Sequence, residues 1–288
     1  MPLVTSRTLI DLAEKHNCAI PAFNTPHLEF MMWVLSKAEA LRSPVMIQVA
    51  PVEHRYTDIR ALSASLSALS ARYTVPFSLH LDHAHQYPEI VEAIQSGFSS
   101  VMIDASRYSF EENVCLTRRV VEVAHTVNIL VEGEIGRVGG LEGDESWENE
   151  ESGDSYYTTT EEAVQFVRET GVDSLAVAVG TRHGLYSGES PTLNIQRVRE
   201  IREGTAIPLV LHGGSGTPVE QLQLACRSGV RKINFSTILR VAFLRGLQGY
   251  LTQDNGEFFL PKIFEAASRE VVRDVQECFD SCLSAGIA

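Results

Sequence analysis

Three histidines stand where the sequence predicts that β-strands end. His83 follows the run FSLHLD, His183 follows DSLAVAVGTR, and His212 closes IPLVLH. A catalytic zinc ion is usually held by three protein ligands and keeps one coordination position open. One histidine alone is more simply explained as a hydrogen-bonded structural residue. Three at the same rim of a fold predict a metal site.

Acidic and amide side chains occupy most of the other predicted strand ends. They are Asn24, Asp82, Asp104, Glu134 and Asn234. A ring of polar groups is costly in a buried mouth unless a metal or substrate compensates it. Asp82, beside His83, is suited to transferring a proton to a reacting oxygen. Asp104 and Glu134 could bind a second divalent cation, exchange with the first site, or orient its histidines. The sequence leaves these options open.

Two turns rich in glycine and hydroxyl groups predict an anion site. HGGSG at 212–216 leads toward a helix starting near Thr217 and Pro218, and NFST at 234–237 follows the next predicted strand. Glycine lets the backbone approach an anion, and helix N-termini direct N–H groups toward it. The simpler alternative is ordinary N-capping by Ser215, Thr217 or Ser236.

The elements that must bring these residues together alternate along the whole chain. Strands are expected at 19–24, 44–50, 76–82, 99–104, 128–134, 173–179, 207–212 and 230–235, with helical patterns between them, for example at 27–42, 59–73, 111–126 and 159–170. Such alternation predicts a parallel sheet, and eight units predict a closed TIM (β/α)8 barrel whose strand ends share one face. We expect one domain over 1–288, with an additional C-terminal helix at about 261–284 that covers the barrel or meets another subunit. His80, inside a strand, is expected to be a packed, hydrogen-bonded residue.

Composition narrows the classes of partner. A formal net charge of −13 argues against binding nucleic acid. Five scattered cysteines without a CxxC pair are typical of a reducing compartment. The start MPLVTSR has no apolar run, and no segment is apolar for long enough to span a bilayer. We expect a cytoplasmic homodimer or homotetramer with no membrane partner.

Longer motifs resemble the class II (zinc-dependent) fructose-bisphosphate/tagatose-bisphosphate aldolases. The similarity covers nearly the whole chain and is weakest at the C-terminus. The motifs are PAFN (21–24), SPV (43–45), LDH (81–83), MIDAS (102–106), FEENV (110–114), VEGEIGRVGGLEGD (131–144), TGVDSLAVAVGTRHGLY (170–186), PLVLHGGSG (208–216) and KINFST (232–237).

The resemblance implies a role for each site residue. It implies zinc binding by His83, His183 and His212, proton transfer at the aldehyde oxygen by Asp82, and a second metal position at Asp104 and Glu134. It implies that Glu142, in the glycine-rich acidic loop 136–158, exchanges the C1 proton of dihydroxyacetone phosphate. The implied phosphate-binding residues are Gly184, Gly213, Gly214, Ser215, Asn234, Phe235, Ser236 and Thr237, commonly helped by Na⁺ or K⁺; we add Asn24 as a substrate contact.

The expected reaction is reversible cleavage of tagatose or fructose 1,6-bisphosphate to dihydroxyacetone phosphate and an aldehyde such as glyceraldehyde 3-phosphate. Two differences from the usual family sequence bear on which sugar is the substrate. Ser236 stands where many fructose enzymes carry Asp, and QVAP at 48–51 replaces a serine-containing loop. Lys262 and Arg269 are candidates for the far phosphate.

Four alternatives remain. They are an aldolase for another ketose 1-phosphate, a non-catalytic partner subunit of such an aldolase, a Schiff-base aldolase and a barrel metal-hydrolase. The Schiff-base enzyme would have to use Lys232, the only lysine on a predicted strand. The hydrolase commonly has an HxH pair after the first strand, where this chain reads AFN.

Overall fold

Eight parallel strands close into a barrel. The computed structural model describes residues 2–25, 27–54, 56–140, 157–184, 191–253, 256 and 258–288. The strands are β1 (Ile20–Asn24), β2 (Val45–Val49), β3 (Phe77–Ala84), β4 (Ser100–Ile103), β5 (Leu130–Ile135), β7 (Ser174–Val177), β9 (Leu209–Leu211) and β10 (Val230–Phe235), each beside the next, with β10 closing on β1. Each overlaps a predicted strand, so the TIM-barrel prediction is confirmed.

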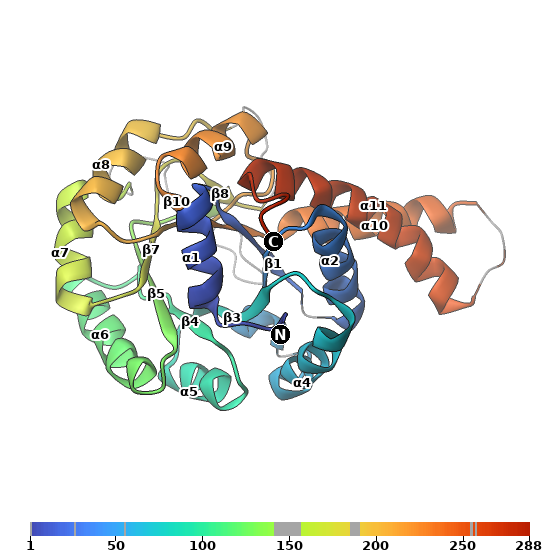
Figure 1. Ribbon diagram of the computed structural model, residues 1–288, viewed down its shortest axis with the longest axis horizontal. Coiled ribbons are helices and arrows are strands. Elements are labelled where there is room, and N and C mark those ends of the chain that lie inside the picture. The colour runs from blue at the N-terminus through green and yellow to red at the C-terminus, as the bar shows by residue number, and fades with distance from the viewer. Residues whose placement is uncertain are drawn as a thin grey trace.

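Helices surround the barrel (Figure 1). They are α1 (Ser6–His16), α2 (Leu28–Leu41), α3 (Pro51–His54), α4 (Ile59–Leu69), η1 (Ser70–Arg72), α5 (Tyr87–Gln95), α6 (Phe110–Thr126), α7 (Thr160–Thr170), α8 (Ile195–Thr205), α9 (Val219–Arg227), α10 (Thr237–Leu251) and α11 (Leu260–Cys282). Side-chain caps at Ser109 and Thr159 begin α6 and α7, because each hydroxyl accepts an otherwise unpaired N–H of the first turn. Within the described part of the chain, no helix is long and apolar enough to cross a membrane.

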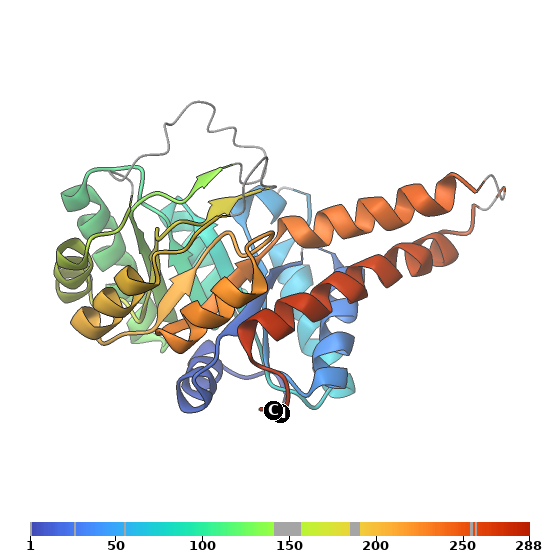
Figure 2. The ribbon, with the colours of Figure 1, turned by 90° about the horizontal axis from the view of Figure 1, so that it is seen from above.

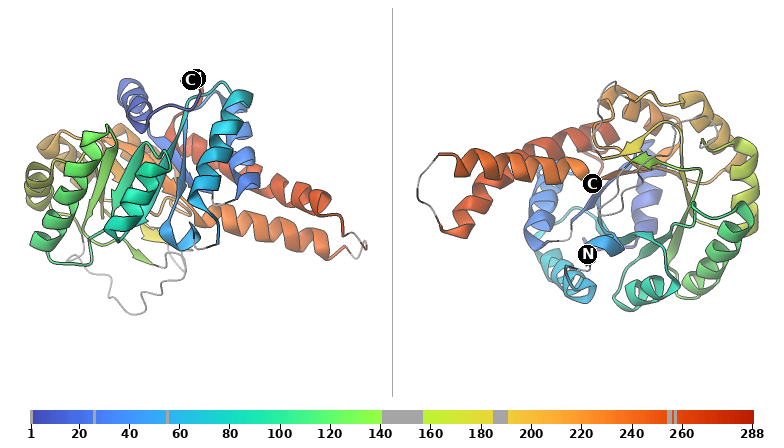
Figure 3. Two further views of the ribbon diagram at one scale, coloured as in Figure 1. Left: turned by 90° about the horizontal axis from the view of Figure 1, so that it is seen from below. Right: turned by 180° about the vertical axis from the view of Figure 1, so that it is seen from behind.

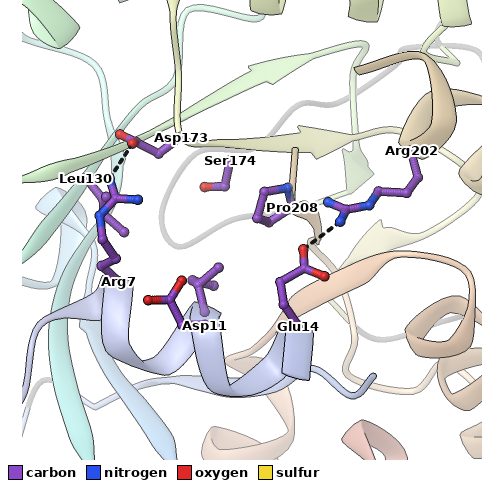
Figure 4. A pocket seen from close by; sticks show the side chains of 9 residues that line it. Arg7, Asp11, Glu14, Leu130, Asp173, Ser174, Arg202 and Pro208 are labelled. Carbon is purple, nitrogen blue, oxygen red and sulfur yellow. Dashed lines mark hydrogen bonds and ion pairs between the residues drawn. The ribbon is translucent and has the colours of Figure 1, made fainter. Parts of the chain in front are cut away.

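The amino-terminal end of the barrel is covered by α1, which contacts β1, β2, β3 and β10. Figure 4 shows the pocket left between α1 and the beginnings of β5, β7 and β9. Two ion pairs cross it: Arg7 Nη2 lies 2.8 Å from Asp173 Oδ1, and Arg202 Nη2 lies 2.8 Å from Glu14 Oε1. This end of the barrel is therefore closed by a helix and salt bridges, opposite the carboxyl ends of the strands.

The last two helices form an antiparallel arm that projects from one side of the barrel (Figures 2 and 3). Its base is held by an aromatic cluster in which Phe243 of α10 lies 5.2 Å from Phe30 and 5.7 Å from Phe264, between ring centroids. The carboxyl-terminal half of α11 is buried at Val271, Val275 and Phe279, and α11 contacts α2, α9 and β1. The predicted C-terminal helix is confirmed, and half of it covers the barrel.

Polar side chains occupy the barrel interior toward the carboxyl ends of the strands, above an apolar cluster of Ile20, Ala22 and Met46. Apolar strand residues such as Leu79 and Leu81 pack outward against the helices, whereas the alternating positions His80 and Asp82 are 1% exposed. Both bond to side chains of β10, which is not a neighbour of β3, so these contacts cross the barrel interior. Two-residue periodicity thus stacks polar side chains in layers below the mouth.

Candidate metal centre and active site

His83, His183 and His212 meet at the mouth of the barrel. Their ring centroids lie 5.3 Å apart for His83 and His183, 4.4 Å for His83 and His212, and 6.0 Å for His183 and His212. One potential ligand atom from each lies within 4.8 Å of the others. A tetrahedral zinc with bonds of about 2.0–2.1 Å separates its ligand nitrogens by about 3.4 Å, so small side-chain movements fit the three to one ion.

The backbone at His83 explains how two consecutive residues both face the mouth. Adjacent strand residues normally point to opposite faces. His83 has φ 44°, in the left-handed region that non-glycine residues rarely adopt, and the register of β3 with β4 shifts between Leu81 and Ala84. This irregularity turns His83 inward beside Asp82.

A small second sheet positions His183. The short strand β8 (Arg182–His183) pairs with β6 (Gly139–Gly140), and Gly140 is opposite His183. The loop after β5 therefore starts beside a candidate metal ligand. Glu142, two residues further on, lies outside the described residues.

Burial favours the neutral form of His183 and His212, the form that binds metals. Removal from water, and then the neighbouring His83 and His212, lower the pKa of His183 to about 3. Burial also lowers the pKa of His212, against the opposing effect of its hydrogen bond to Glu132.

Asp104 bonds to one of the three histidines. Its Oδ2 lies 2.9 Å from His83 Nδ1, and its Oδ1 accepts hydrogen bonds from the backbone and hydroxyl of Ser106. Burial opposes ionisation of Asp104, but the bonds from His83 and Ser106 outweigh it and hold its pKa below the usual range. Ligand atoms of His83, Asp104 and Glu134 also lie within 4.8 Å of one another. Both the orienting option and the second-metal option therefore fit the arrangement.

Three amides surround the carboxylate of Asp82. Asn24 Nδ2 and Gln48 Nε2 donate to Oδ2 at 3.0 and 3.1 Å, and Asn234 Nδ2 donates to Oδ1 at 2.9 Å. Burial opposes ionisation, but the positive potential of His83 and Lys232 prevails and lowers the pKa of Asp82 to about 2. Asp82 is therefore a carboxylate at neutral pH, able to accept a proton.

The two predicted anion-binding turns lie side by side. Gly214 N donates to Asn234 O at 3.0 Å, and a Cβ at Gly214 would meet Ile233 Cγ2 at 2.7 Å. Ser215 Oγ accepts from Ile238 N at 3.2 Å, so this hydroxyl caps α10, which begins at Thr237 after Ser236. Ser215 thus caps α10 and not α9, the helix that follows it in sequence, and Ser236, the N-cap residue of α10, makes no side-chain cap bond. The two turns still gather at the N-terminus of a 15-residue helix.

The other predicted phosphate contacts differ in what they can offer. Gly213 and Gly184 have φ 69° and 88°, which glycine adopts readily, and Gly184 follows His183 directly. The Phe235 ring is buried and stacks on Phe23 at 5.6 Å, so only the backbone of Phe235 is suited to a ligand. Lys262 and Arg269 lie instead in the groove between α10 and α11 on the arm.

Sequence reasoning missed Gln48 and Glu132, which are buried inside strands. For Glu132 the sequence did carry a signal: it stands two residues before Glu134, as His80 stands two residues before Asp82, and residues two apart on a strand point to the same face. His80 is packed and hydrogen-bonded to Ser100 at 2.7 Å, as predicted. Lys232, the Schiff-base candidate, is 2% exposed and ion-paired with Glu132 at 2.7 Å, which opposes that alternative.

A TIM barrel with three histidines and a carboxylate at its mouth has the architecture of a metal-dependent barrel enzyme. The chain belongs to the class II fructose-bisphosphate aldolase family, whose model, described as "Fructose-bisphosphate aldolase class-II", matches residues 4–287. It is therefore a lyase of the aldolase type.

Solved structures agree with this assignment. The YdjI aldolase from Escherichia coli K12 is 32% identical, with 99% of this chain and 98% of that chain covered and a TM-score of 0.85. A protein from Coccidioides immitis described as a candidate fructose-1,6-bisphosphate aldolase is 31% identical, with 98% and 96% covered and a TM-score of 0.86. Fructose-bisphosphate aldolase from Campylobacter jejuni is 22% identical, with 99% and 97% covered and a TM-score of 0.83, and supports the fold alone.

Proposed function

We propose that this protein is a zinc-dependent aldolase of carbohydrate metabolism that reversibly cleaves a ketose 1,6-bisphosphate, tagatose or fructose 1,6-bisphosphate. The products would be dihydroxyacetone phosphate and an aldehyde such as glyceraldehyde 3-phosphate. The observation that carries this proposal is the meeting of His83, His183 and His212 beside the amide-bound carboxylate of Asp82. The names of two relatives, YdjI aldolase and a candidate fructose-1,6-bisphosphate aldolase, support the same class.

Zinc would be held by the three histidines, with Asp104 and Glu134 as a second metal position. When bound, the metal would supply Lewis-acid polarisation of the substrate ketone. The carboxylate of Asp82 takes the proton from the hydroxyl group on the carbon that becomes the aldehyde. As that C–O bond becomes a carbonyl, the carbon–carbon bond breaks and its electron pair passes to the ketone fragment. In condensation, Asp82 returns the proton.

The remaining fragment is an enediolate that needs a proton at C1. By resemblance, Glu142 supplies it. The paired turns at 213–215 and 234–237, with Gly184 and a monovalent cation, would hold the phosphate, because glycine lets the backbone approach an anion and the dipole of α10 favours negative charge at its N-terminus. Asn24 would contact the substrate while it holds Asp82 in place.

One observation favours testing ketose 1-phosphates that lack a second phosphate. Glu53, 8% exposed, lies beside Asn24, and its Oε2 accepts from Ala50 N at 3.0 Å. Its Oε1 lies 2.7 Å from Arg240 Nη2. The charge of Arg240 at this place is thus already balanced by a carboxylate, so Arg240 attracts a second phosphate less strongly than an unpaired cation would. An aldolase for another ketose 1-phosphate is therefore the second candidate function.

The test is cleavage of a panel of ketose 1-phosphates and 1,6-bisphosphates by zinc-loaded protein, coupled to detection of dihydroxyacetone phosphate. Release from at least one substrate, abolished by EDTA and restored by zinc, is expected. Turnover that survives EDTA, or a panel without dihydroxyacetone phosphate, would contradict the proposal. We further propose a cytoplasmic homodimer or homotetramer, which light scattering on the purified chain would test.

A further inference from the structure

A second polar layer lies beneath the candidate metal centre and bonds to it. Lys232 Nζ on β10 donates to Glu132 Oε2 on β5 at 2.7 Å. The other oxygen of that carboxylate, Glu132 Oε1, lies 2.9 Å from His212 Nε2. All three residues are at most 2% exposed, so water does not compete for these bonds.

The direction of each bond follows from which groups can donate. An ammonium group has donors only and an ionised carboxylate has acceptors only. With Lys232 on one oxygen, Glu132 stays ionised, so His212 Nε2 must carry the hydrogen. A neutral imidazole has one N–H, and the lone pair of His212 is therefore on Nδ1.

That Nδ1 atom points toward the other candidate ligands. It makes no hydrogen bond to any described residue, and it lies 3.3 Å from Glu134 Oε2. The ring of His83 is 4.4 Å from that of His212. A lone pair and a carboxylate oxygen at this distance repel each other, and a cation between them would remove that repulsion.

On the side of Lys232 away from Glu132, His80 and Ser100 complete the hydrogen bonds of this layer. His80 Nε2 lies 3.2 Å from Lys232 Nζ and must accept, so the hydrogen of His80 is on Nδ1 and is donated to Ser100 Oγ at 2.7 Å. Burial, and then Lys232, lower the pKa of His80 to about 3, which keeps this ring neutral. The ammonium group of Lys232 can only donate hydrogen bonds. The donor and acceptor assignment between Glu132 and His212 therefore does not depend on how His80 and Ser100 are bonded.

We propose that Glu132, held as a carboxylate by Lys232, is a positioning residue that fixes the tautomer and ring orientation of His212 so that Nδ1 faces the metal. This inference rests on the proposed metal-dependent function. Lys232 has a second effect: its charge balances that of Glu132, so the mouth receives a strong acceptor without added net charge. Partners of this kind around metal-binding histidines typically affect metal affinity about 10- to 100-fold.

The test is the metal affinity of Glu132→Gln, measured by competition with a chromophoric chelator on metal-free protein. His212 and Lys232 bond to different oxygens of Glu132, and an amide replaces one of these oxygens with an NH2 donor, so it cannot accept from both partners in these positions. We expect zinc affinity to fall about 10- to 100-fold and the visible absorption of the Co²⁺-loaded protein to change, since it reports coordination geometry. Unchanged affinity and an unchanged Co²⁺ spectrum would overturn the inference.

Two further variants separate positioning from general stability. Ser100→Ala removes the buried hydrogen bonds of Ser100 Oγ to His80 and Ser6, on the far side of Lys232, and is expected to keep the zinc affinity and Co²⁺ spectrum of the wild type. Glu132→Gln with Lys232→Met leaves the amide oxygen free to accept from His212, so this protein should bind zinc more tightly than Glu132→Gln alone. Equal losses in all three variants would show a structural effect only and contradict the inference. Wild-type protein that takes up no zinc would instead refute the proposed function.

Discussion

The two polar layers inside the barrel differ in how completely their hydrogen bonds are made. In the lower layer, the side chains of His80, Glu132 and Lys232 bond to one another or to neighbouring groups. In the mouth, His212 Nδ1, Gln48 Oε1 and Asn234 Oδ1 are buried without a hydrogen-bond partner among the described residues. Buried polar atoms are normally satisfied in native proteins. The lower layer therefore has a structural role, whereas the mouth, with these unpaired polar atoms, is suited to binding a ligand.

Removing a mouth histidine should have the largest effect on activity. We expect His83→Asn to lose zinc binding and to lower kcat by about 10³-fold or more, because several kcal/mol of Lewis-acid stabilisation disappear. Asparagine tolerates the left-handed backbone of position 83 better than alanine, so folding is preserved. Metal content and turnover measure this, and a zinc-loaded, active variant would remove His83 from the metal centre.

Asp82→Asn tests the proton-transfer role within the same layer. The amide cannot take up the substrate proton, so we expect kcat to fall about 10²- to 10⁴-fold. Zinc content should stay at the wild-type level, since His83, His183 and His212 are unaltered. Loss of zinc together with activity would instead identify Asp82 as a metal ligand.

Substitutions in the lower layer should mainly change the free energy of unfolding. Lys232→Met leaves Glu132 as a buried carboxylate that has lost its 2.7 Å ion pair, which should lower the free energy of unfolding by about 3–5 kcal/mol. Denaturant titration of metal-free protein measures this. Adding Glu132→Gln removes the stranded charge and should restore part of the loss; a double variant as unstable as Lys232→Met would show that packing, not charge, dominates this layer.

Acidification should weaken both layers of the metal-free protein. His80 and His183 have pKa values lowered to about 3 in the fold, mainly by burial, whereas unfolded histidine titrates near pH 6.5. Below about pH 6.5 the unfolded chain takes up protons that the fold excludes, so stability present above that pH is lost on acidification. Each histidine should contribute about 1 kcal/mol to the fall in the free energy of unfolding measured between pH 6.5 and 5.5. A flat profile over this range would show that these histidines protonate inside the fold.

Much of this arrangement could be predicted because strand ends and their residue types are local in sequence. The eight strands and the meeting of His83, His183 and His212 follow from alternation and barrel closure. Gln48 and Glu132 were missed because each stands inside a strand and not at its end, and the polarity of a barrel interior depends on partners from distant strands. The left-handed backbone of His83 and the direction of the α10–α11 arm also depend on tertiary packing, which helical periodicity does not specify.

Substitutions in the pocket at the amino-terminal end (Figure 4) should have the smallest effect on stability and turnover, and they serve as a control for the other variants. The Arg7 side chain is 61% exposed, so Arg7→Ala should cost less than about 1 kcal/mol of stability. Asp173 Oδ2 keeps its bonds to His125 Nε2 and Val131 N, both at 2.8 Å, so no buried charge is left unpaired. Turnover and zinc affinity should match the wild type. A tenfold loss of turnover would show that Arg7, at the amino-terminal end of the barrel, affects the mouth. The division of the barrel into structural and ligand-binding regions would then be wrong.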